Sequence, residues 1–264
     1  MIYVNGGSVT DGTGLCDYQL IPNYPGNMKI RDIKIMNSWG VQRRNFLHNS
    51  LENYEMWSKM NYEKAWPNYA FKNYINNAAG GSSIFSICVN SIMDISNLLS
   101  RGIKITGICI DLPGFERLSL IKNNNADTHS SKRPKWIKSI SPNHYHNLPK
   151  SLTNYFKESW SVRSSEDLLI NALINISHLN SFTHDSLGFY PTYISSELNI
   201  EYCKTIIDNG VTDVGHYWLT QSRILDIDIL LYKLHDTEFL ADGHYDLEFH
   251  LKLGEYIKQK LNFE

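Results

Sequence analysis

The chain has 264 residues, of which 42% are hydrophobic, 12% aromatic and 20% charged, and its formal net charge is −2. This composition is typical of a globular protein with a full hydrophobic core. The lack of a basic excess excludes a general polyanion binder, so no nucleic-acid partner is expected. No run of 18 apolar residues occurs in the sequence, so we expect no membrane span and no membrane partner.

The four cysteines, Cys16, Cys88, Cys109 and Cys203, are widely spaced and form no CxxC pair. We expect buried free thiols in a reducing compartment rather than a disulfide framework. The first residues lack the charged and apolar regions of a secretory signal peptide, so a cytoplasmic location is expected. Asn, Ile, Lys and Tyr, whose codons are AT-rich, are abundant, which fits a low-GC genome such as that of a virus or phage.

The first third of the chain begins with an apolar run at residues 2–5 that ends in a Gly-Gly pair. This pattern predicts a buried strand followed by a tight turn. Residues 15–50 contain two prolines and show no clean period, so they are expected to be loop-like. Apolar residues near helical spacing then predict a helix over 52–75, with Pro67 in a first-turn position of its second half.

In the middle of the chain, Ser82 or Ser83 can cap the next helix. The apolar stripe of this helix covers residues 84–99, and Gly102 fits the position just after its end. Residues 104–111 then predict a second buried strand, which ends at a Leu-Pro-Gly sequence.

The last part of the chain begins with residues 118–163, which carry no clean period. We expect them to form an insertion or lid over the site rather than a separate domain. Ser164 or Ser165 can cap a further helix with a leucine and isoleucine stripe. Residues 189–195 predict a strand, and 246–261 predict the last helix.

Strands that alternate with helices indicate an α/β fold. We expect a three-layer α/β/α sandwich with a mostly parallel central sheet, in a single domain over residues 1–264. In such sheets the ligand crevice lies at the carboxyl ends of the strands. The turn that holds Ser8 and the turn after Asp111 are both expected at that edge.

Ser8 is flanked by glycines in the turn after the first strand, where the backbone can expose its hydroxyl. A serine hydroxyl is a weak nucleophile until a base removes its proton, and that base needs an orienting carboxylate. Asp242 and His244, just before the last helix, supply both groups. The alternative is that Ser8 only caps a helix and that His244 is a histidine of a surface loop.

Together these segments resemble the SGNH/GDSL hydrolase family. That family opens with a strand and Gly-Asp-Ser-x-x-x-Gly, which residues 6–12 match. Its second block is an Asn followed five residues later by a Gly, matched by Asn76 and Gly81. The family closes with an Asp and a His before the last helix, as Asp242 and His244 do here. The resemblance covers nearly the whole chain and implies a flavodoxin-like arrangement of strands.

The resemblance implies a triad mechanism without cofactor or metal. Ser8 would attack the acyl carbon, and His244 would take its proton and pass it to the leaving alcohol. Asp242 would orient the imidazole, and the backbone N–H groups of Ser8 and Gly81 would donate to the oxyanion. The substrate would be a small-molecule or carbohydrate ester, for example a carbohydrate O-acetyl ester.

The sequence departs from the family pattern at two of these blocks. Gly7 replaces the Asp that precedes the nucleophile, so one supporting hydrogen bond is missing. Asp242 lies two residues before His244, where the usual spacing is three, so the orienting acid could instead be Asp236 or Glu238.

The third block of the family, Gly-x-Asn-Asp, is also missing, and residues 111–117 stand in its place. Arg117 could substitute for the Asn as an oxyanion donor or could bind an acidic substrate, because a guanidinium binds oxyanions. The alternative is that Arg117 forms a surface ion pair with Glu116 or another neighbour.

Several other readings of the sequence stay open. His144 and His146 would share a face of a strand as a metal pair, but no third ligand stands at a recognisable spacing. A group of basic residues around Trp136 could suggest nucleic acid, although a solvated loop fits the net charge better. This group consists of Lys132, Arg133, Lys135 and Lys138.

Three functions compete with a hydrolase. An acyltransferase would use the same residues with an alcohol in place of water. An inactive binding or structural module would keep the fold without its chemistry. A nucleotide-binding protein would use the glycine turn at 6–14 to hold a phosphate, although that turn lacks the Lys-Ser/Thr of a P-loop.

Overall fold

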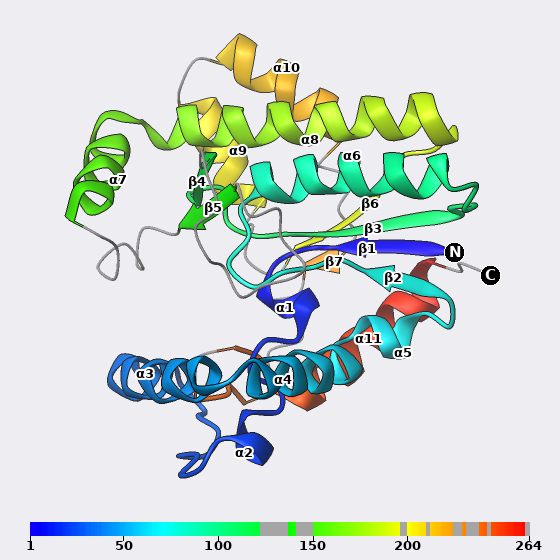
Figure 1. Cartoon of the computed structure of the whole chain (residues 1–264). Helices are drawn as coiled ribbons and strands as arrows, with labels where there is room; N and C mark the ends of the chain where they lie inside the picture. The colour runs from blue at the N-terminus through cyan, green and yellow to red at the C-terminus, as the bar shows by residue number, and fades with distance from the viewer. Residues whose placement is uncertain are drawn as a thin grey trace.

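The computed structural model describes residues 1–121, 137–140, 150–195, 200–209, 212–223, 229–230, 238–241 and 244–261. Within them the chain forms an α/β fold in which helices cover both faces of a parallel sheet, as the sequence predicts (Figure 1). The strands of this sheet lie in the order β2 (Tyr74–Asn76), β1 (Ile2–Asn5), β3 (Gly107–Leu112), β6 (Thr192–Ser195) and β7 (Ile229–Leu230).

Neighbouring strands of the sheet all pair in parallel. Numbered by their sequence within this sheet, the strands follow the order 2-1-3-4-5, which is that of flavodoxin-like doubly wound folds. Asn5 pairs with Ile110, so Asp111 and Leu112 extend β3 beyond the end of β1. Strand β2 lies on one side of β1, and the later strands lie on the other side. The strand order therefore reverses between β1 and β3.

Side chains of the strands alternate between two hydrophobic layers, as the pleat of a strand requires. Tyr3 and Ile108 belong to one layer, whereas Val4 and Cys109 belong to the other. The first layer is closed by α6 (Ile84–Ser100), α8 (Ser165–Leu187), α9 (Ile200–Asp208) and α10 (Thr212–Ser222). The second is closed by α5 (Pro67–Ala70) and α11 (Leu247–Leu261) (Figure 1).

The expected helix caps are present. Ser83 begins α6 by accepting a hydrogen bond from the backbone N–H of Ser86, and Gly102 follows the helix with φ +72°. Ser164 likewise caps α8 through the N–H of Asp167. These side-chain caps satisfy backbone donors that a helix leaves unpaired.

The expectation of a loop over residues 15–50 is wrong. The segment contains α2 (Asp17–Leu20) and the long helix α3 (Ile33–Asn49), which Asp32 caps. Trp39 is the buried residue of α3, so the apolar stripe is too sparse to produce a helical period in the sequence. The helix expected over 52–75 is also interrupted. It consists of α4 (Leu51–Lys64) and α5, with Pro67 in the first turn of α5, before the chain enters β2.

A buried carboxylate fastens α2, α3 and α4 together. Asp17 accepts a hydrogen bond from the indole of Trp39 at one oxygen and from the indole of Trp57 at the other, both at 2.7 Å. Nη1 of Arg43 lies 3.5 Å from the same carboxylate. Because two donors and a cation surround it, Asp17 can stay buried in its charged form.

The region expected to be an insertion or lid contains regular structure in its described parts. Strands β4 (Leu118–Ile121) and β5 (Ile137–Ile140) form an antiparallel pair, and α7 (Lys150–Val162) follows. Phe156 of α7 is fully buried, and the indole of Trp160 donates to the carbonyl of Glu116 at 3.0 Å. Helix α7 is therefore packed on the body of the fold.

All four cysteines are buried and unbonded to one another, as the sequence predicts. Cys88 and Cys203 lie in the layer of α6 and α8, and Cys109 lies in the layer of α11. Cys16 donates a hydrogen bond to the carbonyl of Trp57 beneath α4. No helix in the described residues is long and apolar enough to cross a membrane.

Candidate active site

The carboxyl ends of β1 and β3 mark the point where the strand order reverses, and ligands of open α/β sheets bind at such a point. The turn after β1 carries Ser8 at the start of α1 (Ser8–Asp11). The turn after β3 carries Pro113, whose Cβ is 4.0 Å from where a Cβ on Gly7 would lie. The two turns therefore lie side by side at this edge of the sheet.

Asn5 shapes the turn before Ser8. Its side-chain oxygen accepts the N–H of Gly6 at 2.8 Å, and its amide nitrogen donates to Ser91 of α6 at 2.9 Å. A Cβ on Gly6 would lie only 2.7 Å from the Cβ of Asp111, so β3 could not approach this turn if Gly6 carried a side chain.

Ser8 lies against the loop that follows β2. A Cβ on Gly80 would be 3.6 Å from the Cβ of Ser8 and 2.7 Å from Oγ1 of Thr13. The N–H of Gly80 donates to Asp11 at 3.3 Å, which holds the loop against α1. The second block therefore does meet the serine turn, with Gly80 in contact and the predicted donor Gly81 following it at φ +73°. The N–H of Gly81 has no hydrogen-bond acceptor in the described part of the chain.

Asn76 also acts on the serine helix. Its amide nitrogen donates to the carbonyl of Thr10 at 2.9 Å, and its oxygen accepts the N–H of Ala78 at 3.0 Å. Both contacts are buried. Asn76 thus joins the end of β2 to α1 and fixes the start of the glycine loop.

Ser8 itself is 8% exposed. Among the described residues its hydroxyl has no hydrogen-bond partner, and this includes His244. The direct Ser8–His244 hydrogen bond is therefore not formed in this structure. Catalytic hydrogen bonds are often long before substrate binds and tighten afterwards.

His244 is half-buried in the strand-like segment before α11. Its carbonyl accepts the N–H of Leu240 at 2.8 Å, and the next residue, Tyr245, bridges Phe239. Tyr245 shares a hydrophobic cluster with Val9, the residue after Ser8. The serine turn and the histidine segment are thus fixed on the same face of the sheet.

A chain of buried hydrogen bonds runs through this face. Thr10 donates to Asp111 at 2.9 Å and accepts from the indole of Trp66 at 3.2 Å. The backbone N–H of Trp66 donates to Nδ1 of His250 at 3.2 Å. Burial, with a smaller contribution from the nearby His244, lowers the pKa of His250 to about 3. His250 is therefore neutral at physiological pH, with its proton on Nε2.

The orienting acid can be located only in part. Asp242 and the alternative Asp236 lie outside the described residues, as does Gly243. The other alternative, Glu238, is exposed, and its backbone carbonyl accepts the N–H of Asp246 at 3.3 Å.

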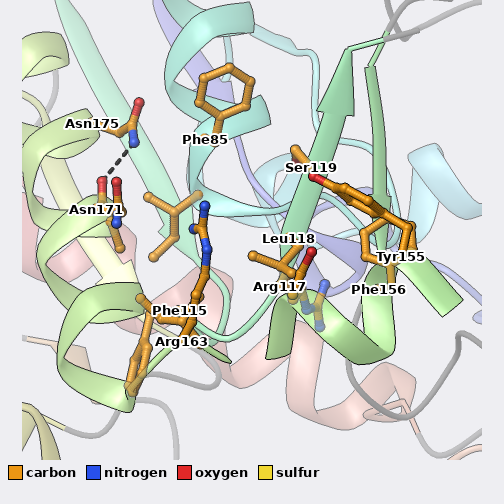
Figure 2. A pocket seen from close by; sticks show the side chains of 14 residues that line it. Phe85, Phe115, Arg117, Leu118, Ser119, Tyr155, Phe156, Arg163, Asn171 and Asn175 are labelled. Atoms are coloured by element: carbon orange, nitrogen blue, oxygen red, sulfur yellow. Dashed lines mark hydrogen bonds between the residues drawn. The ribbon is translucent and has the colours of Figure 1, made fainter. Parts of the chain in front are cut away.

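Arg117 reaches the serine turn from the segment after β3. Its Nη1 is 4.0 Å from where a Cβ on Gly7 would lie, and it donates to the carbonyl of Ser82 at 3.1 Å. Figure 2 shows the same side chain in the wall of a pocket that also contains Phe115 and Leu118. A positive charge thus lies beside the residue that precedes the candidate nucleophile.

The structure does not test the other candidate sites from the sequence. His144, His146 and Trp136 lie outside the described residues, as do the first three basic residues around Trp136. In the described ranges no group of three or more His, Cys, Asp or Glu side chains could hold a metal ion.

Sequence reasoning missed the residues that support the serine turn. Asn5, Thr10 and Asp111 each form buried hydrogen bonds at this edge of the sheet. The position of Asp111 at the end of a buried strand was a usable signal, because polar residues there face the crevice. Nothing in the sequence pairs Trp66 with His250, since 184 residues separate them.

Models of known protein families give no match to this chain, and a search of characterised proteins finds no relative.

Proposed function

We propose that this protein is a serine ester hydrolase of the SGNH/GDSL type, with Ser8 as nucleophile and His244 as base. One observation carries the proposal. Three segments that are distant in the sequence meet at the reversal point of the sheet: the Ser8 turn, the glycine loop after β2 and the Arg117 side chain. A hydroxyl can serve as the nucleophile of acyl transfer, and backbone donors and a guanidinium can stabilise its oxyanion.

In the first step, Oγ of Ser8 attacks the carbonyl carbon of the ester while His244 accepts its proton. The carbonyl oxygen becomes an oxyanion, which the N–H groups of Ser8 and Gly81 stabilise. Arg117 supplies the side-chain donor that the family's third block would give. The imidazolium then protonates the leaving alcohol, and the acyl group stays on Ser8.

In the second step, a water molecule attacks the acyl-enzyme while His244 accepts a proton from it, and Ser8 leaves with that proton. Asp242 is the proposed orienting carboxylate for His244. The substrate is a small-molecule or carbohydrate ester, and an O-acetyl ester of a carbohydrate is a concrete candidate. An alcohol in place of water would make the same residues an acyltransferase.

A fluorophosphonate probe tests the nucleophile directly, because it reacts covalently with activated serines. We expect intact-protein mass spectrometry to find one adduct on the wild type and none on Ser8→Ala. Ser181→Ala is the matched control, since Ser181 is an exposed serine on the remote helix α8. Persistent labelling of folded Ser8→Ala would rule out Ser8 as the nucleophile.

A binding module without catalysis is the second candidate, and the missing hydrogen bond between Ser8 and His244 favours it. It predicts a folded wild type that neither reacts with the probe nor hydrolyses 4-nitrophenyl acetate. If hydrolysis occurs, adding an alcohol such as glycerol distinguishes hydrolase from transferase by the acyl product that forms.

A further inference from the structure

A pocket of about 220 Å³ lies between the start of α6, the start of β4, α7 and α8 (Figure 2). The Arg117 guanidinium lies beside Gly7 on one side and lines the pocket on the other. A ligand group in this pocket would therefore extend from the reacting centre. The volume suits a small group rather than a drug-sized molecule.

The charge of the pocket is one-sided. Arg117 and Arg163 are both among its described lining residues, and no Asp or Glu is among them. Arg163 forms an ion pair with Asp167, whose Oδ2 lies 3.7 Å from Nε of Arg163. Both partners of this pair are more than 40% exposed, at 43% and 49%, so solvent screens it.

Arg163 is positioned to use its terminal nitrogens. The ion pair with Asp167 engages Nε, and the Nη atoms donate no hydrogen bond to a described residue. Figure 2 shows the guanidinium extending between Leu118 and the asparagines of α8, Asn171 and Asn175. A planar guanidinium in such a position matches the two oxygens of a carboxylate or the oxygens of a phosphate.

The remaining walls of the pocket combine aromatic and aliphatic side chains with four polar ones, Ser119, Ser159, Asn171 and Asn175. Phe85 of α6, Phe115 of the turn after β3 and Phe156 of α7 contribute rings, and Phe156 is itself fully buried. The aromatic part of this lining favours an apolar body attached to the charged group. A bare inorganic anion would leave these rings without a partner.

We infer that this pocket binds an anionic group on a small apolar body, held by Arg117 and Arg163, and that the substrate of the enzyme carries such a group. The second half of this inference rests on the proposed function, whereas the first half does not. The shared chemistry is that of a carboxylate or a phosphate monoester, and the test includes both.

The primary test measures binding without turnover, in the Ser8→Ala protein. The probes are 3-phenylpropionate, its neutral amide 3-phenylpropanamide, and phenyl phosphate, with Kd determined by calorimetry or ligand-observed NMR. We expect at least one anion to bind about tenfold more tightly than the amide, with affinity that falls as salt is added. Equal affinity for the anions and the amide, or no binding of either anion, would overturn the inference.

Arg163 provides the specific variant, because it takes no part in the proposed chemistry. Arg163→Gln should weaken anion binding about tenfold and change amide binding less than about twofold, and Arg163→Lys should restore part of the loss. Circular dichroism and the melting temperature verify that the variants fold. An anion affinity unchanged in folded Arg163→Gln would disprove the role of this residue.

A kinetic arm separates the two halves of the inference. If the pocket adjoins the catalytic site, the tighter anion should inhibit hydrolysis of 4-nitrophenyl acetate competitively in the wild type and about tenfold less well in Arg163→Gln. If the protein binds the anion but hydrolyses no ester, the inference about the pocket stands and the proposed function is rejected. Hydrolysis that the bound anion does not inhibit would reject the link between pocket and substrate.

Discussion

The backbone N–H of Trp66 donates to Nδ1 of His250 across 3.2 Å, which ties the last helix of the fold to the short helix α5. Trp66 also donates through its indole to Thr10, two residues after the candidate nucleophile. The position of the serine helix therefore depends on a histidine that is itself a poor candidate for the catalytic base, because it is fully buried, its Nδ1 already accepts the Trp66 N–H, and its pKa of about 3 makes it a weak proton acceptor.

Two replacements of His250 should show how much its hydrogen bond with Trp66 contributes to stability. His250→Phe leaves the N–H of Trp66 without an acceptor, so we expect a loss of about 1–3 kcal/mol in the free energy of unfolding. His250→Asn keeps an acceptor oxygen at a similar position and should lose less. Urea denaturation at pH 7 measures both, and a His250→Phe protein as stable as the wild type would contradict the assigned contact.

The pH dependence of stability should change in His250→Asn. The pKa of His250 is about 3 in the folded protein, below its ordinary value of 6.5. As the pH falls below 6.5, the unfolded chain takes up a proton that the folded chain does not accept until about pH 3. The stabilisation present above pH 6.5 is therefore lost by up to about 1.4 kcal/mol per pH unit in that window. The difference between wild type and His250→Asn should shrink on acidification, and parallel curves would exclude this titration.

Asp17→Asn should destabilise the unit of α2, α3 and α4. One carboxylate oxygen becomes an NH₂ group that faces an indole N–H, and the partner of Arg43 loses its charge. Hydrogen bonds to charged groups are worth about 1.5–3 kcal/mol each, so we expect a loss of about 3 kcal/mol. Hydrogen exchange should rise first in these three helices. A loss below about 0.5 kcal/mol would mean that the contacts of Asp17 with Trp39, Trp57 and Arg43 contribute little to stability.

Gly80→Ala tests the close contact between the glycine loop and the serine turn. The added Cβ would lie 2.7 Å from Oγ1 of Thr13, so either the Thr13 hydroxyl turns and loses its hydrogen bond to Asp11, which also holds the N–H of Gly80, or the loop shifts. We expect kcat/KM for 4-nitrophenyl acetate to fall at least about tenfold, because oxyanion donors act only within hydrogen-bond distance.

The control for this change is Gly40→Ala. Gly40 lies inside α3, and a Cβ there meets no atom within 4 Å. The substitution should stabilise the protein by about 0.5–1 kcal/mol and leave kcat/KM unchanged. Equal activities of the two variants would show that the loop tolerates displacement.

The role of His244 predicts a pH profile. A base must be neutral to accept the proton of Ser8, so both fluorophosphonate labelling and ester hydrolysis should slow as the pH falls and the imidazole gains a proton. His244→Gln should remove most of the activity and flatten what remains. A wild-type profile that is flat from pH 5 to 8 would argue against this residue as the base.

The sequence predicted the layers of the fold well because each depends on a local pattern. The stripe of α6, the cap at Ser83 and the apolar run of β1 all reside in neighbouring residues. Helix α3 was missed because its main buried contact is a single tryptophan whose partner, Asp17, lies 22 residues away. Propensity and period carry no information about such a contact.

The candidate site divides in the same way. Short motifs single out the Ser8 turn and the stretch from Asn76 to Gly81, and the fold brings these two segments together. The polar network of Thr10, Asp111 and Trp66 could not be identified, because its members come from three elements and follow no spacing. The pairing of Ser8 with His244 stays a prediction.

The four buried thiols lie in separate parts of the molecule, so their reactivity can report local unfolding in each part. Burial raises the pKa of Cys16 and of Cys203 to about 12, and those of Cys88 and Cys109 rise as well, so the intact protein presents almost no thiolate to an alkylating reagent. Iodoacetamide would thus modify each cysteine only when the surrounding structure unfolds locally and exposes the thiol. Alkylation rates measured for each cysteine could then rank three regions by how often they unfold locally. These regions are the two sides of the sheet and the part of the chain around Cys16 and α4.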